Sequence, residues 1–180
     1  MGQYYKPAIL GNNRKTVKSY MLAHDYGTGL KIMEHSWQNN KFVSTFESLI
    51  LDNPQRVVWA GDYAENCGGR KTNIYQRCFG EGKKSNKIKP SVKGLTIAES
   101  RYVINHSKKV YVDKLKVPAV DGYTMHPLPL LTCEGNGSGG GDFYGSDARG
   151  LVGKWARNIV SVSATQPVGY KELLFDLIEN

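Results

Sequence analysis

Residues Arg56-Val-Val-Trp-Ala-Gly61 form the stretch that decides the fold. β-Branched and aromatic side chains pack well on a pleated sheet, so this short apolar run predicts a buried strand that ends at the glycine. Two predicted hairpins lie on either side of it in the sequence. Residues 3–10 and 16–23 surround a turn-forming cluster at 11–15, and residues 101–105 and 109–112 surround His106-Ser-Lys108.

Apolar residues at helical spacing predict three helices. One lies near 29–36, and a longer amphipathic helix covers 40–51 with Asn39 or Asn40 as its N-cap. The third covers 169–178, where the apolar residues are Leu173, Leu174, Leu177 and Ile178.

Three more strands are predicted between these elements. They cover 72–79, 130–133 and 158–164, and the last is expected to have one wet face because its apolar residues alternate with polar ones. The chain is therefore expected to be a single α+β domain, 1–180. It would have a mainly antiparallel sheet, two or three packed helices and a glycine-rich loop.

The glycine-rich segment is Glu134-Gly-Asn-Gly-Ser-Gly-Gly-Gly-Asp142. Glycine reaches positive φ without steric cost, so at least two of these glycines are expected to have φ > 0. One interpretation is an anion- or ligand-binding loop of successive backbone N–H groups, and the other is a tightly packed structural turn. The loop residues are Gly135, Asn136, Gly137, Ser138, Gly139, Gly140 and Gly141.

Two nucleotide-binding motifs do not fit this segment. A dinucleotide-binding loop needs a helix after the glycines and an acidic residue about 20 positions further on. Residues 142–150 have no helical pattern, and no acidic residue lies between Asp147 and Glu172. A phosphate-binding P-loop fails as well, because no Gly-Lys-Ser/Thr follows the glycines.

The positive charge is concentrated in one window of the chain. Residues 83–116 contain nine Lys and one Arg against two acidic residues, whereas the remaining 14 basic residues are matched by 14 acidic ones. Such asymmetry favours an anionic partner, and the alternative is a solvated lysine-rich loop that keeps the protein in solution. Residues 80–94, rich in Gly and Lys, are predicted to be a mobile basic loop.

Lysines interleaved with tyrosines are typical of surfaces that follow a phosphate backbone and stack on bases. The predicted nucleic-acid or partner-binding residues are Lys83, Lys84, Lys87, Lys89, Lys93, Arg101, Tyr102, Lys108, Lys109, Tyr111, Lys114 and Lys116. Binding through them should weaken steeply with salt, because phosphate contacts release counterions.

Histidine and carboxylate side chains offer an alternative, enzymatic site. His24, Asp25, Asp62, Glu134 and Asp142 stand beside loop glycines and are expected to converge around the glycine-rich segment. Together they could hold a divalent metal ion that activates water for phosphoester cleavage. Because no His-Glu-x-x-His or other diagnostic metal spacing occurs, no metal site and no cofactor are predicted outside this alternative.

The cysteines and the hydropathy narrow the class of protein further. Cys67, Cys78 and Cys133 are an odd number without a Cys-x-x-Cys pair, so they are predicted to be reduced packing residues. No apolar run approaches the roughly 20 residues of a membrane span, and the first residues lack the pattern of a signal peptide. The protein is therefore expected to be cytoplasmic and to have no membrane partner.

Five separate segments resemble a family of small uncharacterised proteins of bacteria, phages and mobile elements. The segments are Met1-Gly-Gln-Tyr-Tyr5, Gly29-Leu-Lys-Ile-Met-Glu-His-Ser-Trp37, Val58-Trp-Ala-Gly-Asp-Tyr-Ala64, residues 130–142 and Val152-Gly-Lys-Trp155. The family pattern reads LLTADGNGRGGGD in the glycine-rich loop, where this chain has Cys133-Glu134 for AD and Ser138 for the arginine. No activity is assigned to the family, so the resemblance implies no catalytic residue.

The resemblance implies a phage or mobile-element origin. With the concentrated positive charge, it predicts a binding protein that engages a nucleic acid or a host nucleoprotein machine, for example as an anti-CRISPR or other counter-defence inhibitor. The alternative is a metal-dependent phosphoesterase or nucleotide-processing enzyme with its site at the glycine-rich loop.

Overall fold

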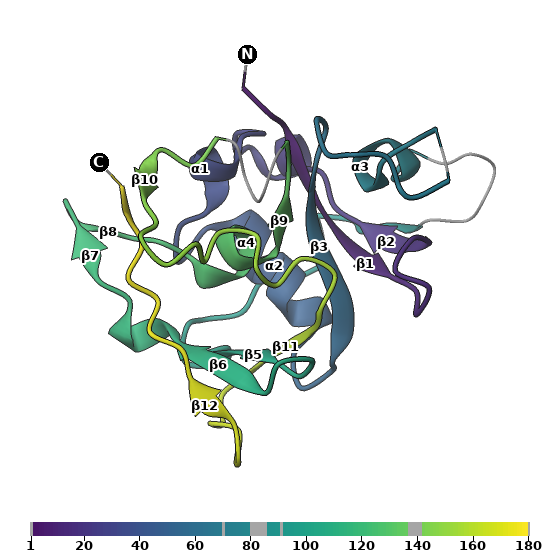
Figure 1. Cartoon of the computed structure of the whole chain (residues 1–180). Coiled ribbons are helices and arrows are strands. Elements are labelled where there is room, and N and C mark those ends of the chain that lie inside the picture. Colours follow the sequence, from purple (N-terminus) through teal and green to yellow (C-terminus); the bar gives the residue numbers. More distant parts are fainter. Residues whose placement is uncertain (1, 70, 80–85, 91, 137–141, 180) are drawn as a thin grey trace.

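The computed structural model describes residues 2–69, 71–79, 86–90, 92–136 and 142–179 (Figure 1). Its strands are β1 (Tyr5–Leu10), β2 (Val17–Tyr20), β3 (Gln55–Gly61), β4 (Asn86–Lys87), β5 (Tyr102–Asn105), β6 (Val110–Asp113), β7 (Ala119–Val120), β8 (Tyr123–Thr124), β9 (Cys133–Glu134), β10 (Gly145–Ser146), β11 (Ile159–Ser163), β12 (Lys171–Glu172) and β13 (Ile178–Glu179). Its helices are η1 (Ala23–Tyr26), α1 (Ile32–His35), α2 (Lys41–Leu49), α3 (Ile74–Arg77), η2 (Lys114–Lys116) and α4 (Pro127–Thr132), of which η1 and η2 are 3₁₀ helices.

The strands form one large mixed sheet and two small ones. The large sheet has the order β12-β6-β5-β11-β3-β1-β2-β4, with β9 as an additional neighbour of β3, and the small sheets are β10–β13 and β7–β8. Pairing is antiparallel along β2-β1-β3-β11-β5-β6 and parallel between β12 and β6, β2 and β4, and β3 and β9. The fold is thus a strand-rich mixture of α and β elements with short helices, and its sheet contains parallel pairs that were not expected.

β3, the stretch that was expected to be a buried strand, lies in the middle of the large sheet. It pairs with β1 along its whole length, from Tyr5 opposite Gly61 to Leu10 opposite Arg56. Its side chains alternate between the two faces, so Trp59 joins a core under α2 and α4 while Val58 packs on the other face near α3. The predicted strand is confirmed.

The helix α2 supplies much of the core on the inner face of the sheet. The Asn40 side chain accepts hydrogen bonds from the backbone N–H groups of Phe42 and Val43, as the predicted N-cap requires. Phe42 and Phe46 then pack edge-on against Trp59 at ring-centroid distances of 5.9 and 5.2 Å. The cap and the apolar stripe therefore place α2 where the sequence predicts it.

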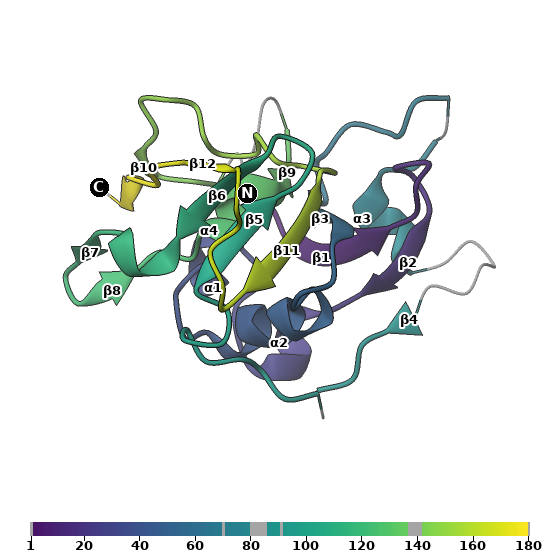
Figure 2. The same cartoon turned by 90° about the horizontal axis from the view of Figure 1, so that it is seen from below.

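The outer face of the sheet has two separate covers. Over β1, β2 and β3 the cover is α3, which contributes Ile74 to a second apolar cluster. Over β5 and β6 the cover is the segment 164–170, which crosses this part of the sheet on its way from β11 to β12 (Figure 2). Its Tyr170 packs against Tyr102 and Tyr111, and the latter two rings meet edge to face at 5.8 Å.

This second cover corrects the expected wet face of β11. Ser161 and Ser163 are buried, because His106 and the segment 164–170 lie over them. The ring Nε2 of His106 lies 2.7 Å from Ser161 Oγ, and its Nδ1 lies 3.0 Å from Tyr170 Oη. The Ser161 hydroxyl is therefore buried and hydrogen-bonded to His106 on the face of β11 that was expected to contact solvent.

Two expected strands are short helices. Residues 72–79 contain α3, because Asn73 caps Gln76 and the Gln76 side chain returns to the Asn73 N–H, forming a capping box. Residues 130–133 mostly belong to α4, which begins at Pro127, a residue that suits the first turn of a helix. Of this segment only Cys133 lies in a strand, β9, which continues to Glu134.

The expected helix at 169–178 is wrong, because this segment is extended. Leu173, Phe175 and Leu177 point inward, whereas Leu174 is exposed. This period of two fits a strand-like chain that runs along the sheet from β12 to β13. The apolar residues that suggested a helix serve this alternation instead.

Several further expectations can be placed. Cys67, Cys78 and Cys133 are buried, as expected of packing residues. The expected loop 80–94 contains β4, and its Lys83 and Lys84 lie outside the described residues. Gly137, Ser138, Gly139, Gly140 and Gly141 also lie outside them, so the φ > 0 prediction stays a prediction. None of the helices in the described ranges has the length and apolar character to cross a membrane.

Candidate nucleic-acid interface

The candidate interface lies where β3 exchanges one neighbouring strand for another. β11 pairs only with the first two residues of β3, whereas β9 pairs with Trp59 and Ala60 near the other end. The segment before β11 fills the space between these two neighbours, and the Arg157 N–H donates to the Val57 carbonyl at 2.8 Å. This connection fixes Arg157 at the junction, on the outer side of the sheet.

The Arg157 side chain ties the junction together. Its Nε and Nη2 donate to the two carboxylate oxygens of Glu134 at 2.8 and 2.5 Å, and its Nη1 donates to the Arg14 carbonyl at 3.1 Å. Burial opposes the guanidinium charge, but the hydrogen bonds and charge of Glu134 outweigh it, so the pKa of Arg157 is raised. The pair links β9, the β1–β2 turn and the segment before β11.

A cavity of about 240 Å³ opens beside this pair. It leads to the start of the glycine-rich segment, because Gly135 contributes to its wall. The lining residues are Glu65, Asn66, Cys67, Gly68, Glu134, Gly135 and Arg157. Buried Cys67 and the Glu134–Arg157 pair form the inner part, so the cavity is a polar recess with one cation and two carboxylates.

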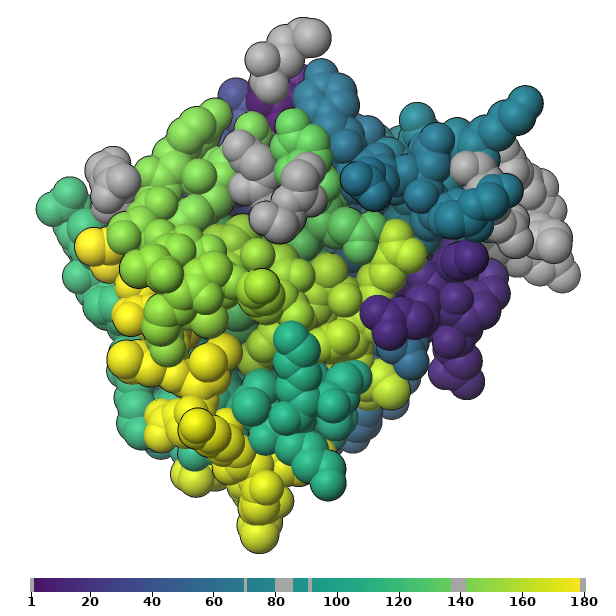
Figure 3. All heavy atoms as spheres, viewed as in Figure 1, coloured from purple at the N-terminus to yellow at the C-terminus, as the bar shows by residue number. Residues whose placement is uncertain are grey.

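A row of basic side chains extends from this recess across the ends of the strands. We call it the basic strip, and its residues are Arg14, Lys15, Arg56, Lys108, Lys109, Lys154, Arg157 and Lys171. Figure 3 shows the elements that carry most of it on one face: the β1–β2 turn in purple, the segment 150–158 in lime, the β5–β6 turn in teal and β12 in yellow.

Hydrogen bonds to backbone carbonyls join the members of the basic strip into one surface. Arg56 Nη1 donates to the Arg157 carbonyl at 2.7 Å, and Lys108 Nζ donates to the Lys154 carbonyl at 2.8 Å. The Lys171 N–H donates to the Lys109 carbonyl at 3.0 Å. With strands about 4.8 Å apart, the five steps from β1 to β12 span about 24 Å.

The basic strip keeps most of its charge. Within the described ranges, Arg157 is its one member with an ion pair. Burial and, next to it, the charge of Arg14 lower the pKa of Arg56, which indicates how closely these cations are placed. Neighbouring cations that outnumber the carboxylates near them create the positive potential that attracts a phosphate backbone.

Backbone conformation supplies a second sign of function. Among the described residues other than glycine, six have positive φ, and three of these belong to the basic strip: Arg14 at 62°, Lys109 at 53° and Arg157 at 63°. Asn or Gly adopts this conformation more easily than a long basic side chain does. Residues held in such conformations cluster at functional sites, and Arg14 and Lys109 also close the β1–β2 and β5–β6 turns.

Of the predicted binding residues, Lys108 and Lys109 lie in the basic strip. Several others are neutralised, because Lys87 pairs with Asp25 at 2.9 Å, Arg101 with Asp113 at 2.8 Å and Lys116 with Glu172 at 2.6 Å. Lys89 and Lys93 are exposed but lie beside η1 and α2, since Lys89 O accepts from Tyr26 and Leu95 N donates to Ser44 O.

The expected role of Tyr102 and Tyr111 in stacking on bases is wrong. Both rings are buried against each other under the segment 164–170, so neither presents a face to a ligand. The strand pattern places alternate side chains on the covered outer face of β5 and β6. Tyr102 and Tyr111 therefore pack inside the protein and cannot stack on the bases of a ligand.

Lys114 is also not available for binding, because it is buried. Its Nζ donates to Glu47 Oε1 at 2.5 Å and to Ser100 Oγ at 2.7 Å. His126 Nδ1 accepts from the Leu128 N–H, so its Nε2 carries the proton and donates to Glu47 at 3.0 Å. We call Glu47, Ser100, Lys114 and His126 the buried charge network.

The pKa values in the buried charge network follow from this arrangement. Burial opposes the charge of Glu47, but His126 and Lys114 outweigh burial and lower its pKa. Burial lowers the pKa of Lys114 and that of His126. The network therefore pairs the Glu47 side chain with those of Lys114 and His126, and it joins α2, η2 and α4.

The five residues of the enzymatic alternative separate into two places. His24 and Asp25 lie together, and Asp25 pairs with Lys87 of β4. Asp62 and Asp142 accept hydrogen bonds from the successive backbone N–H groups of Tyr4 and Gln3. The remaining carboxylate, Glu134, is held by Arg157. In the part of the chain that the structure describes, no three His, Cys, Asp or Glu side chains are grouped to hold a metal ion.

One residue, Gln3, holds both ends of the glycine-rich segment through its side chain and its backbone N–H. Gln3 Nε2 donates to Asn136 Oδ1 at 2.5 Å, Asn136 N–H donates to Gln3 Oε1 at 3.2 Å, and Gln3 N–H donates to Asp142. A Cβ on Gly61 would lie 2.8 Å from the Glu134 carbonyl, so glycine is required for this approach. The ends of the segment are thus fixed against β1 and β3.

The other segments named in the family resemblance meet here too. Trp59 Nε1 donates to His35 Nε2 at 2.8 Å, and His35 Nδ1 donates to the Gly29 carbonyl at 2.9 Å. The Trp155 N–H donates to the Leu131 carbonyl at 2.7 Å. His35 is therefore a buried residue with both ring nitrogens hydrogen-bonded.

Sequence reasoning missed most of the basic strip. The missed residues are Arg14, Lys15, Arg56, Lys154, Arg157 and Lys171. Counting charge by windows concealed them, because acidic residues elsewhere in the sequence balance them numerically. A usable signal existed in the basic residues at predicted strand ends, such as Arg14 and Lys15 in the first hairpin turn and Arg56 at the start of β3.

Comparison of the chain with family models, with curated proteins and with solved structures found no match.

Proposed function

We propose that this protein binds nucleic acid through the basic strip. The observation that carries the proposal is the row of cations across the strand ends, which has one ion pair among its described members. About 24 Å of strip corresponds to about seven base pairs of duplex at 3.4 Å per pair. The recess beside Arg157 adjoins this row, because Lys15 Nζ donates to the carbonyl of its lining residue Gly68 at 3.3 Å.

The chemistry of the basic strip favours the backbone rather than the bases. Its side chains are Lys and Arg, and the two tyrosines that could have stacked on bases are buried. Lys and Arg bound to phosphates position a protein without reading sequence. The proposed binding is therefore tolerant of sequence, and it should weaken as counterions compete at higher salt.

A narrower form of the proposal follows from the family resemblance. In this form the nucleic acid belongs to a host nucleoprotein machine, and the protein acts as a counter-defence inhibitor of phage or mobile-element type. The enzymatic alternative, a metal-dependent phosphoesterase or nucleotide-processing enzyme, gains no specific support. Asp62, Glu134 and Asp142 are each held by a backbone N–H or by Arg157.

A charge-removal variant with a matched control tests the proposal. The strip variant carries Arg14→Asn, Lys109→Asn and Lys154→Gln, and the asparagines suit the positive φ at the first two positions. The control variant carries Lys41→Gln, Lys89→Gln and Lys93→Gln, three exposed lysines on the α2 side. Each variant removes three positive charges, so a general charge effect would be equal in both.

Binding is measured by fluorescence anisotropy of labelled duplex and single-stranded oligonucleotides over a salt series. The strip variant should lose at least about tenfold in affinity, and its salt slope should fall by about 0.7–0.9 for each phosphate contact removed. The control should resemble the wild type. Equal losses in the two variants would contradict the strip as the binding surface, and cleavage of the oligonucleotides with Mg²⁺ would favour the enzymatic alternative.

A further inference from the structure

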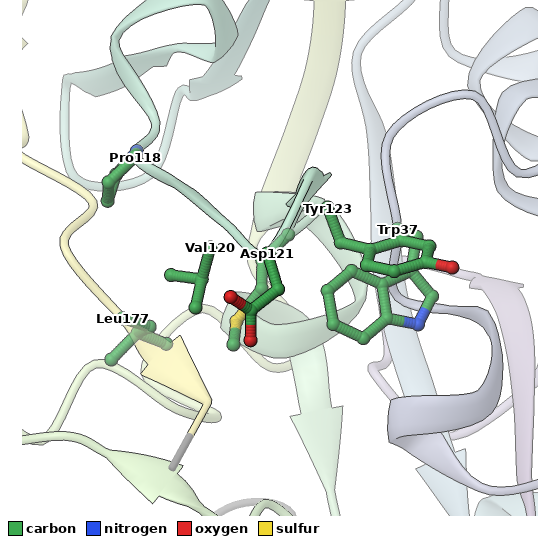
Figure 4. A pocket seen from close by; sticks show the side chains of 7 residues that line it. Trp37, Pro118, Val120, Asp121, Tyr123 and Leu177 are labelled. Carbon is green, nitrogen blue, oxygen red and sulfur yellow. The ribbon is translucent and has the colours of Figure 1, made fainter.

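A second cavity lies on a different part of the molecule, beside the β7–β8 hairpin. Its volume is about 310 Å³, within the range of roughly 300–1,000 Å³ typical of small-molecule pockets. The lining residues are Trp37, Pro118, Val120, Asp121, Tyr123, Met125 and Leu177. All of these except Asp121 present apolar or aromatic surface, so the cavity has one formal charge in an apolar wall (Figure 4).

The turn of the hairpin sets the position of the carboxylate. Asp121 and Gly122 have φ of 49° and 81°, the two positive values of a type I′ turn. This turn matches the twist of the strands, so Asp121 is held at the tip with its side chain beside Trp37 (Figure 4). Within the described ranges Asp121 makes no ion pair with the protein itself, and its charge is available to a ligand.

Two aromatic rings form the adjoining wall. Trp37 and Tyr123 meet at a centroid distance of 5.4 Å with an angle of 58° between their planes, so they make a corner. The indole is fixed, because its Nε1 donates to the Met33 carbonyl at 2.8 Å. Gln38 N–H also donates to the Thr124 carbonyl at 2.8 Å, which ties the Trp37 segment to β8.

We propose that this pocket binds a methylated ammonium group, such as that of choline or of trimethyl-lysine. Aromatic faces attract such a cation through the ring quadrupole, and a nearby carboxylate adds charge attraction. The methyl groups are apolar and need no hydrogen bonds, which suits walls made of Val120, Met125 and Leu177. A metal ion would need several oxygen ligands, whereas this cavity offers one carboxylate side chain.

Choline and its uncharged carbon analogue, 3,3-dimethylbutan-1-ol, separate charge recognition from apolar filling. They have nearly the same shape, so binding of choline alone would show that the positive charge is recognised. Trp37 is half-buried, whereas Trp59 and Trp155 are 0% and 2% exposed, so a change in indole fluorescence on titration reports this pocket. Isothermal calorimetry measures the same affinity independently.

The decisive variant is Asp121→Asn, with Asp52→Asn as its matched control. Asparagine adopts the left-handed conformation more readily than most residues and forms type I′ turns with glycine, so the hairpin is kept while the charge is removed. Asp52 is also exposed and has φ of 48°, but it lies outside the pocket. We expect Asp121→Asn to weaken choline binding about tenfold and Asp52→Asn to leave it unchanged.

A second variant, Tyr123→Leu, tests the aromatic wall. It should weaken choline about threefold and leave the neutral analogue unaffected, because only the cation interacts with the ring face. A peptide with trimethyl-lysine is titrated beside free choline, and the tighter ligand identifies the source of the group. The proposal is overturned if the neutral analogue binds as tightly as choline, if choline shows no saturation at millimolar concentration, or if the two Asp→Asn variants lose affinity equally.

Discussion

The buried charge network and the basic strip use similar cationic side chains in opposite ways. Lys114 is enclosed and neutralised by Glu47 at 2.5 Å, whereas Lys154 is exposed and has no carboxylate partner among the described residues. The first cation joins three elements of the core, and the second contributes to an uncompensated surface. The comparison teaches that the number of charges in a sequence does not say which charges are available to a ligand. Their burial and partners decide that.

The largest expected effect is the loss of the buried carboxylate. Glu47→Gln leaves the Lys114 ammonium enclosed without a counter-charge, so the free energy of unfolding should fall by about 3–5 kcal/mol in urea denaturation. The double variant Glu47→Gln/Lys114→Met removes both charges and should be more stable than Glu47→Gln alone. If the single variant is as stable as the wild type, the network does not hold the core together.

The next largest effect is expected from His35, a buried side chain whose protonation is opposed by the fold. Burial lowers the pKa of His35 from 6.5 to about 4, so the unfolded chain takes up this proton at higher pH than the folded protein does. Its contribution to stability is present above pH 6.5 and is lost as the pH falls from 6.5 towards 4. The loss is about 3 kcal/mol.

Denaturation of the wild type and of His35→Gln at several pH values isolates this contribution. Glutamine can accept from Trp59 and donate to the Gly29 carbonyl without titrating. The stability difference between wild type and variant should therefore shrink as the pH falls from 7 to 4. His106 and His126 are present in both proteins, so their contributions to the pH dependence cancel in the difference. A difference that is constant over this range would show that His35 does not titrate in this way.

Arg157 combines features of the two regions, because it is a strip residue whose carboxylate partner, Glu134, is half-buried. Arg157→Ala removes a half-buried bidentate pair and should cost about 1–3 kcal/mol of unfolding free energy. Arg149→Ala is the matched control, since its pair with Asp176 is exposed and should be worth less than about 1 kcal/mol. Equal costs would mean that the junction between β9 and β11 gains nothing from Arg157.

The smallest effect on stability is expected in the basic strip itself. The variant Arg14→Asn/Lys109→Asn/Lys154→Gln should keep the wild-type unfolding free energy within about 0.5 kcal/mol or raise it. It relieves repulsion and replaces two strained residues by asparagine. Urea denaturation beside the binding measurement checks this. A large loss of stability would show that the basic strip stabilises the fold, as the buried charge network is expected to do.

Much of the central sheet could be predicted from local patterns. The first hairpin, β3, the β5–β6 hairpin and the Asn40 cap of α2 follow from alternation, turn residues and cap chemistry that act over a few positions. The failures came from segments that satisfy two patterns at once. Residues 173–178 carry apolar side chains at both helical and alternating spacing, and only their packing along the sheet selects the extended form.

The candidate site was less predictable, because its parts are distant in sequence. Arg14 and Arg157 are 143 positions apart, yet a hydrogen bond joins them. Pairing of strands brings their turns together, and no local pattern contains that information. Conversely, Lys114 was predicted to bind a partner, but the fold buries it against Glu47, which lies 67 positions earlier. Local sequence identifies cations, but long-range topology assigns their partners.

The short overlap between β11 and β3 has a consequence for how the molecule opens. It divides the sheet into a β1–β2–β3 block and a β5–β6–β11 block, with separate apolar clusters outside and a shared core inside. Such blocks are the natural units of partial unfolding. Because the basic strip crosses the short contact between β3 and β11, a bound nucleic acid would hold the two blocks together. Amide hydrogen exchange at 55–57 and 157–160, the segments that join the two blocks, would then slow.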